Sequence, residues 1–544
     1  MLREDPMITS IPNSRRLLLA LLGSALVAAV VIVAPGTVLA EEPKRGGTLI
    51  MTLHPEPPML VGALNAALPT YVVGPKMVEG LVTYDFDYNL KPALATSWKV
   101  SADGKEITFN LRRGAKFHDG KDFTASDVAF SINVLKERHP RGRTTYANVT
   151  AIETPDSHTV VLKLSKPAPY LMNTLAAPEA PMLPKHVYGG SDIATNPANN
   201  APIGTGPFKF VKWSKGESII VERNPDYWDK GKPYLDRIIF RTIPDSAARA
   251  VALETGEAHL GGSNPVPLSD VERLRSLDHL GIEKRGYEYL LNVARIEFNL
   301  ENQYLKHFKV RQAIAHAIDK NFIVDNIWYG LGTPATGPIH KSHQRYYTAD
   351  GVPTYPYDPK KSEQLLDEAG FKRGDGGVRF KLTHDYLPFG DTFKRTAEYL
   401  KQTLRKIGID VEIRSQDFPS YIRRVYTERD FDFTNHWMVN TSDPTLGVQR
   451  LYWSKNFKPG VPFSNGSGYS NPEVDRLLEA SQVETDPKKR AELFHEFQRK
   501  VVADLPAIDI NFTEDFTIYN KKVKNHTISP LGIHESFAEV YLTE

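Results

Sequence analysis

Cysteine is absent from all 544 residues of the chain. This absence excludes disulfide bridges, thiolate nucleophiles, and zinc or iron–sulfur sites that use cysteine ligands. A bacterial lipoprotein carries its lipid on a cysteine at the processed N-terminus, so we also exclude anchoring to a membrane by that route.

Blocks of like charge are absent as well. The chain has 67 Lys plus Arg against 65 Asp plus Glu, a formal net charge of +2. Nucleic acids and anionic membrane surfaces attract proteins through basic patches, so we expect neither as a partner. A composition of 41% hydrophobic and 24% charged residues is that of an ordinary globular protein, and the length suits two or three domains.

The first forty residues differ from the rest of the chain. Arg15 and Arg16 precede an uncharged stretch, Leu17 to Ala40, whose last three residues suit a signal peptidase. We predict a cleaved export signal over residues 1–40 and a periplasmic protein that is not a lipoprotein. A transmembrane anchor is the alternative, since the apolar run is nearly long enough to span a bilayer, but Pro35 and Gly36 favour removal. The arginine pair also resembles a twin-arginine signal, which leaves the export route open.

Common catalytic signatures are missing too. The chain has no G-x-S-x-G, H-E-x-x-H or G-x-x-x-x-G-K-[ST] motif. His340 and His343 form the closest metal-like pair, but no third ligand stands at a suitable spacing. We therefore expect no cofactor, no metal site and no enzyme, although scattered carboxylates leave a glycosidase open.

The clearest pattern of secondary structure lies between residues 380 and 440. Phe380 to Tyr386 reads as a short strand, and apolar residues from Phe393 to Ile407 then recur at spacings of three and four, which predicts a helix that ends at Gly408. Alternation over residues 409–414 predicts a second strand. A helix from about Ser420 and a strand over 431–439 complete a β-α-β-α-β unit, which requires parallel strands.

Ligands of such sheets bind outside the carboxyl ends of the strands. Three segments occupy those ends: Leu387 to Gly390, Ser415 to Asp417, and Trp437 to Asp443. They supply the first candidate site. For any one residue a structural role, such as a core Trp437 or an Asp443-Pro444 turn, is an equal alternative.

Ordered matches from Gly46 to about Asn511 resemble the extracellular solute-binding protein family 5, which comprises dipeptide-, oligopeptide- and nickel-chelate-binding proteins. The most specific matches lie in residues 79–128, with EGLVTY, PALATSW, FNLR, FHDG and ASDV; others are GTGPF at 204–208, NPDYW at 224–228 and VRQAI at 310–314.

The resemblance implies an α/β, two-lobed periplasmic binding protein fold of type 2, with an extra subdomain in the first lobe and a hinge between the lobes. It implies a first lobe of residues 41–289 plus 512–544 and a second lobe of 290–511. The implied function is to bind peptides or peptide-sized solutes and deliver them to the inner-membrane permease of an ABC importer, as a monomer.

Two family positions for the ends of a ligand depart from the pattern. In the peptide binders, an aspartate three residues before an acidic residue and proline pairs with the ligand's amino group; here that position is Asn440. An arginine after the preceding strand holds the carboxylate in dipeptide binders, and that position is Leu387. Neither residue offers the matching charge, and an unpaired ligand charge would cost several kcal/mol.

The ligand class therefore stays open between peptides and non-peptide solutes such as opines, oligosaccharides or metal chelates. A periplasmic hydrolase and a chemoreceptor-feeding or chaperone-like binder are further alternatives. Aromatic candidates for stacking on a ligand are Trp437, Tyr386, Phe389 and Tyr469. The remaining ligand-binding candidates are His436, Asp443, Asn440, Leu387 and His54, which follows the first expected strand, at Thr48 to Met51.

Overall fold

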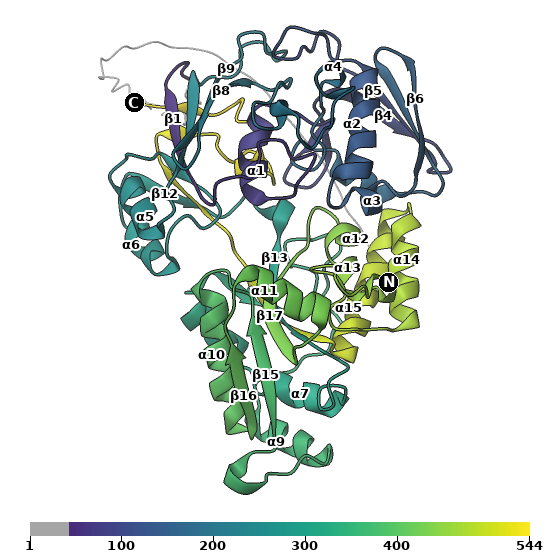
Figure 1. Ribbon diagram of the computed structural model, residues 1–544, viewed down its shortest axis with the longest axis vertical. Helices are drawn as coiled ribbons and strands as arrows, with labels where there is room; N and C mark the ends of the chain where they lie inside the picture. Colours follow the sequence, from purple (N-terminus) through teal and green to yellow (C-terminus); the bar gives the residue numbers. More distant parts are fainter. Residues whose placement is uncertain (1–42) are drawn as a thin grey trace, which may run out of the picture. The chain divides into compact units, whose positions relative to one another are not determined.

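The computed structural model describes residues 43–544 (Figure 1). The export signal predicted for residues 1–40 lies outside this range. None of the helices in residues 43–544 combines the length and the hydropathy that crossing a membrane requires.

A seven-stranded sheet begins with the first predicted strand. β1 (Thr48–Leu53) follows Gly46 and Gly47 and ends at the proline-rich segment after His54, as the sequence predicts. Its strand order is β12-β19-β11-β1-β10-β9-β8, with β1 parallel to β10 and β11. The other strands are β8 (Phe208–Ser214), β9 (Ser218–Arg223), β10 (Arg237–Thr242), β11 (Leu260–Gly261), β12 (Leu280–Glu283) and β19 (Thr517–Asn520).

A four-stranded antiparallel sheet, of order β4-β5-β7-β6, lies between β1 and β8 in the sequence. Helix α2 (Ala125–Arg138) packs against it through Val128, Ile132 and Leu135, all without exposed surface. Its strands are β4 (Ala95–Val100), β5 (Glu106–Leu111), β6 (Val149–Asp156) and β7 (Thr159–Leu164); two-stranded sheets pair β2 (Val82–Tyr84) with β3 (Leu90–Pro92) and β20 (Val523–Lys524) with β21 (Tyr541–Leu542).

A six-stranded sheet has the order β14-β18-β13-β17-β15-β16. The chain enters it between β12 and β13 and returns to the seven-stranded sheet between β18 and β19. The lobe boundaries predicted at 289/290 and 511/512 stay predictions, and the second falls inside β18. The strands are β13 (Asn292–Phe298), β14 (Gly332–Pro334), β15 (Phe380–Tyr386), β16 (Ile409–Arg414), β17 (Phe433–Val439) and β18 (Ala507–Thr513).

The predicted β-α-β-α-β unit is confirmed within this sheet. β15 pairs parallel with both β16 and β17. Helix α10 (Asp391–Lys406) buries the predicted apolar face, including Leu400 and Leu404. The second helix, α11 (Phe418–Ile422), begins two residues earlier than predicted because the Asp417 carboxylate caps it by accepting from the Ser420 amide, and a π-helical turn, η8 (Arg423–Glu428), continues it.

Other helices surround the sheets. The longer ones cover the six-stranded sheet or lie beside β11 and β12, and the short ones occupy the connections. They are α1 (Leu68–Val73), α3 (Gly142–Thr145), α4 (Lys185–Tyr188), α5 (Ser246–Glu254), α6 (Val271–Arg275), α7 (Phe308–His316), α8 (Lys320–Phe322), α9 (Pro359–Glu368), α12 (Pro444–Gly447), α13 (Gln449–Tyr452), α14 (Pro472–Val483) and α15 (Pro487–Asp504).

Gly408 has the left-handed backbone predicted for the end of its helix, with φ of +86°, and Gly370 after α9 has φ of +89°. An added Cβ at Gly408 would lie 2.9 Å from the Arg379 side chain, whereas one at Gly370 meets nothing within 4 Å. We expect Gly370→Ala to lower the free energy of unfolding by about 1–2 kcal/mol, through backbone strain alone. Gly408→Ala should lower the free energy of unfolding by more, because the clash of its Cβ with the Arg379 side chain adds to the backbone strain. Urea unfolding of both variants checks this, and equal losses would contradict it.

Candidate functional site

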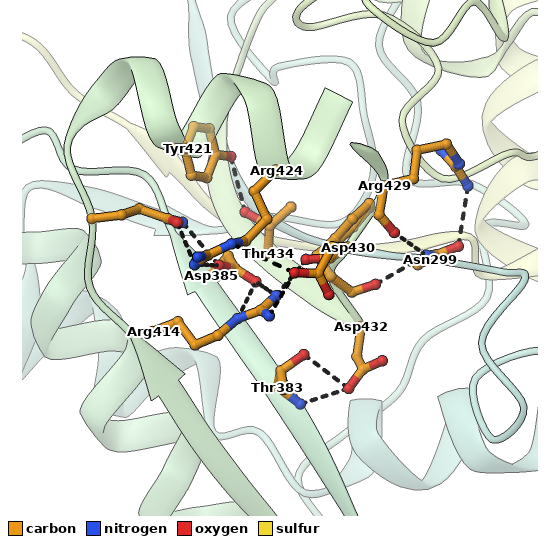
Figure 2. Close-up of polar contacts among 12 residues, drawn as sticks. Asn299, Thr383, Asp385, Arg414, Tyr421, Arg424, Arg429, Asp430, Asp432 and Thr434 are labelled. Atoms are coloured by element: carbon orange, nitrogen blue, oxygen red, sulfur yellow. Dashed lines mark hydrogen bonds and ion pairs between the residues drawn. The ribbon is translucent and has the colours of Figure 1, made fainter. Parts of the chain in front are cut away.

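A polar network ties together the carboxyl ends of β15 and β16 (Figure 2). Asp385, which has no exposed surface, accepts hydrogen bonds from Arg414, from Arg424 at 3.3 Å and from Gln416 at 2.8 Å. The segment after β16 and the turn η8 are thereby held against the end of β15. Charged hydrogen bonds of this kind limit the movement of the loops that carry the candidate site.

Two further contacts fix the neighbouring strand (Figure 2). The Asp432 carboxylate accepts from the amide of Thr383 at 2.6 Å, and the hydroxyls of Tyr421 and Thr434 lie 2.9 Å apart. α11 is thus bonded to β17, and β15 to the residue preceding β17. These contacts join the end of β15, the segment after β16 and the start of β17.

Four aromatic rings line up at this edge, and we call them the aromatic row: Trp437, Phe389, Phe418 and Phe463. Phe389 stacks between Trp437, at 5.6 Å between centroids, and Phe418, at 4.7 Å, and Phe463 lies 6.4 Å beyond Phe418. Neighbouring planes are inclined by 25° or less. Phe389 is 41% exposed, so the row presents apolar ring surface that suits an apolar part of a ligand.

Asn440 and Leu387, which the sequence predicts to occupy the family's ligand-charge positions, both make contacts within the protein. The Asn440 side-chain oxygen accepts from the His340 amide at 2.7 Å, and its nitrogen donates to the Pro338 carbonyl at 3.1 Å. Leu387 is completely buried in the core beside α10 and α11. The Asn440 amide therefore serves to hold the 338–340 loop onto the end of β17.

Asp443 is paired with Arg490 of α15. Both carboxylate oxygens receive guanidinium hydrogen bonds at 2.8 Å, and neither side chain exposes more than 3% of its surface. Burial alone would raise the pKa of Asp443, but the adjacent Arg490 outweighs it and holds the pKa below its usual value. Asp443 also accepts a hydrogen bond from the Asn173 side chain at 3.4 Å. Asn173 lies between β7 and β8 in the chain, well before β13.

The other predicted residues are dispersed. His436 is fully buried, with one ring nitrogen 2.8 Å from Glu297 and the other 2.8 Å from a backbone carbonyl. The hydroxyl of Tyr386 lies 2.8 Å from Ser415, and that of Tyr469 donates to Asp504 at 2.6 Å, in a separate core. His54 is exposed directly after β1. Their roles as ligand contacts stay predictions.

A second polar cluster comes from the part of the chain before β13. Arg141 pairs with Glu179, whose carboxylate also accepts from the Tyr289 hydroxyl at 2.7 Å. Burial would raise the pKa of Glu179, but Arg141 lowers it to about 2. Glu179 is therefore ionised at neutral pH and is neutralised by its own partner.

Arg450 on α13 was not anticipated from the sequence. Its Nε atom is buried without a hydrogen-bond partner among residues 43–544, and no acidic side chain in that range pairs with it. Burial, together with the nearby charge of Arg141, lowers its pKa to about 10. Phe418 and Phe463 were missed as well: Phe418 directly follows a predicted segment, whereas nothing in the local sequence marks Phe463 or Arg450.

Metal-binding groups are not assembled in the described range. No three His, Asp or Glu side chains of residues 43–544 lie close enough to hold an ion. His340 and His343 are directed to different neighbours: His340 packs 4.9 Å from Phe512, and His343 stacks on Tyr88 with 5.6 Å between centroids.

Comparison with known proteins gives consistent matches. Residues 89–459 match the family described as bacterial extracellular solute-binding proteins, family 5 Middle. The oligopeptide-binding protein AppA of Bacillus subtilis is 29% identical over 483 residues, which cover 86% of each chain. The glutathione-binding protein GsiB of Pectobacterium atrosepticum is 29% identical over 486 residues, 87% of this chain and 90% of that protein.

Solved structures of binding proteins also match this chain over most of its length. DppA from Helicobacter pylori, in complex with the peptide STSA, superimposes with a TM-score of 0.78 at 28% identity, covering 92% of this chain and 99% of that one. NikZ from Campylobacter jejuni, in complex with Ni(L-His), gives a TM-score of 0.77 at 26% identity, covering 90% and 97%. The two-lobed α/β fold of these binding proteins is therefore that of this chain, which belongs to family 5 of the bacterial extracellular solute-binding proteins.

Proposed function

We propose that the protein is the periplasmic solute-binding component of an ABC importer and captures a peptide or a peptide-sized compound. The observation that carries this proposal is the aromatic row at the carboxyl edge of β15 and β17, in a chain of family 5. The names of AppA and GsiB and the ligand of DppA support a peptide or a peptide-like compound.

Closure around the ligand would take place at the two passages between the sheets. These are residues 284–291, between β12 and β13, and residues 514–516, between β18 and β19. Short connections of this kind are suited to absorb the backbone rotation of a hinge. The bound form would then dock, as a monomer, onto the inner-membrane permease after export through the signal of residues 1–40.

A non-peptide solute is the second candidate, and Asn440 favours it. Both polar groups of the Asn440 amide are used by the 338–340 loop. A ligand ammonium at this position would find no negative charge, and the amide oxygen there already accepts from the His340 amide. An opine, an oligosaccharide or a metal chelate, such as the one bound by NikZ, has no such requirement.

Binding without turnover is the expected behaviour. Native mass spectrometry of protein purified without unfolding should detect a bound solute. The solute released from the protein should have the same mass as the bound one. Added at about 100 times its dissociation constant, this solute should raise the free energy of unfolding by about 2.7 kcal/mol, because it binds only the folded state. A product of altered mass would instead indicate a hydrolase, and uptake that persists without a cognate permease would indicate a sensory or chaperone role.

A further inference from the structure

Arg450 is a cation without a counter-ion in the part of the chain that the structure describes. Its Nε atom is buried and makes no hydrogen bond, and the hydroxyl of Tyr426, which lies within electrostatic range of it, is also buried without a partner. Unpaired buried polar groups destabilise a folded protein unless something else satisfies them. Two such groups in one neighbourhood make it a candidate site for a bound molecule.

Two buried acids that could have served as counter-ions are already paired with other arginines. Glu179 is bonded to Arg141, and Asp443 to Arg490 at 2.8 Å. Arg141 itself lies near enough to act on Arg450 electrostatically. An anion bound at Arg450 would relieve the repulsion between the two guanidinium groups.

Arg450 is connected to the aromatic row through Tyr426. The ring of Tyr426 lies 5.4 Å from that of Phe463, the last member of the row. A ligand with an anionic group at one end and an apolar or aromatic body at the other has the chemistry to match both features. A guanidinium is charged at neutral pH and fits the two oxygens of a carboxylate in bidentate geometry.

We propose that Arg450 binds a carboxylate of the transported solute while its apolar body lies on the aromatic row, and that a free amino group on the solute is not required. This inference rests on the proposed function and specifies the ligand class. In this proposal the ligand carboxylate is bound by a residue of α13. The loop after β15 does not bind it, because Leu387 there is apolar and buried. It also accounts for the use of Asn440 as a purely internal hydrogen-bonding group.

The test uses the full-length exported protein and a panel of paired compounds. The panel holds peptides of two to five residues, N-acyl amino acids and opine-type conjugates, each as the free acid and as its primary amide, and each peptide also N-acetylated. Dissociation constants are measured by calorimetry for the wild type, Arg450→Gln, Arg450→Lys and the control Arg476→Gln, which removes an exposed arginine from α14.

We expect the best acid to bind at least about 10- to 100-fold more tightly than its amide, since a charged hydrogen bond is lost. Arg450→Gln should weaken binding of the acid by the same factor and leave the affinity for its amide unchanged. Arg450→Lys should retain part of the affinity for the acid, and Arg476→Gln should change neither affinity. N-acetylation should have little effect. The melting temperature of unliganded Arg450→Gln should not fall, because the substitution removes an unpaired charge.

Equal binding of acid and amide by the wild type, or acid binding that survives Arg450→Gln, would refute the carboxylate site and leave the transport function standing. A melting temperature that falls in unliganded Arg450→Gln, with an unchanged ratio of acid to amide affinity, would assign Arg450 a structural role only. Failure of the wild type to bind any compound of the panel, and to carry a solute through purification, would count against the proposed function itself.

Discussion

Replacement of Arg490 by methionine is expected to lower the free energy of unfolding by about 3–5 kcal/mol. Arg490 is 3% exposed and donates to both oxygens of Asp443 at 2.8 Å, to the Thr445 hydroxyl at 2.8 Å and to the Ser481 carbonyl at 2.7 Å. Methionine keeps much of the apolar volume but leaves the Asp443 carboxylate buried without a counter-ion. The loss therefore measures an uncompensated charge rather than a cavity.

A matched control lies on the same helix. Arg499 reaches Asp350 at 3.8 Å near the surface, with 34% and 96% of the two side chains exposed. Arg499→Met should change the free energy of unfolding by less than about 1 kcal/mol, because exposed ion pairs are weak. The double variant Asp443→Asn/Arg490→Met should recover part of the loss, since both charges are then gone. Urea unfolding of the four proteins at pH 7.5 checks these values; an Arg490→Met variant as stable as Arg499→Met would show that the pair is not structural.

Stability is expected to fall steeply below pH 6.5. Burial lowers the pKa of seven largely buried histidines to about 3 or 4, because a buried imidazolium is poorly solvated. They are His118, His139, His340, His343, His384, His526 and His534. In the unfolded chain each returns to a pKa of about 6.5, so between these values the unfolded state binds more protons.

The sign follows from this difference in protonation. Above pH 6.5 the histidines are neutral in both states and add no pH dependence. As the pH falls toward 4, each removes stability at up to about 1.4 kcal/mol per pH unit. Glu179, with its pKa lowered to about 2, acts in the same direction below pH 4.5, since its stabilisation is lost as the pH falls through its folded pKa. Glu79, whose pKa burial raises to about 7, opposes the trend, as do Glu288, Asp509 and Asp515, whose pKa burial also raises, but the seven histidines outnumber these four groups.

Since domains are stable by only about 5–15 kcal/mol, we expect unfolding before pH 4 is reached. Urea midpoints measured at pH 7.5, 6, 5 and 4.5 should decline below pH 6.5. The variant His384→Phe keeps a flat ring against Phe433, which stacks at 4.2 Å between centroids. Its stability should depend on pH less steeply than that of the wild type, by up to about 1.4 kcal/mol per pH unit. Constant midpoints from pH 7.5 to 5 would contradict the effect of burial on the histidines.

Much of the six-stranded sheet around the candidate site could be predicted, because the sequence patterns that specify its strands and helices are local. The period of the apolar residues identifies β15, α10 and β16 with boundaries within a residue or two, and Gly408 marks the end of the helix. The parallel pairing of β15 with β16 and β17 follows from the alternation of strands and helices. Trp437 and Phe389 were predicted in the same way, as residues at or just after the carboxyl ends of parallel strands, and the structure stacks their rings 5.6 Å apart.

The partners of the candidate residues could not be predicted, because they come from distant parts of the chain. Asp443 resembles a ligand-binding acid until Arg490, 47 residues later, is seen to pair with it. Asn440 likewise is bonded to the loop of His340, 100 residues earlier. The sequence records which groups are charged but not which of them are already neutralised, and the availability of a group for a ligand depends on that pairing.

Composition and local periodicity thus establish a cysteine-free α/β protein, and ordered motifs along the chain establish its family. Only the tertiary structure brings Phe418 and Phe463 into line with Phe389, and leaves the Arg450 Nε atom buried without a hydrogen-bond partner among residues 43–544. The physical reason is that a helix or strand is specified by neighbours in sequence. Stacking and charge balance are properties of neighbours in space, and folding alone decides which residues these are.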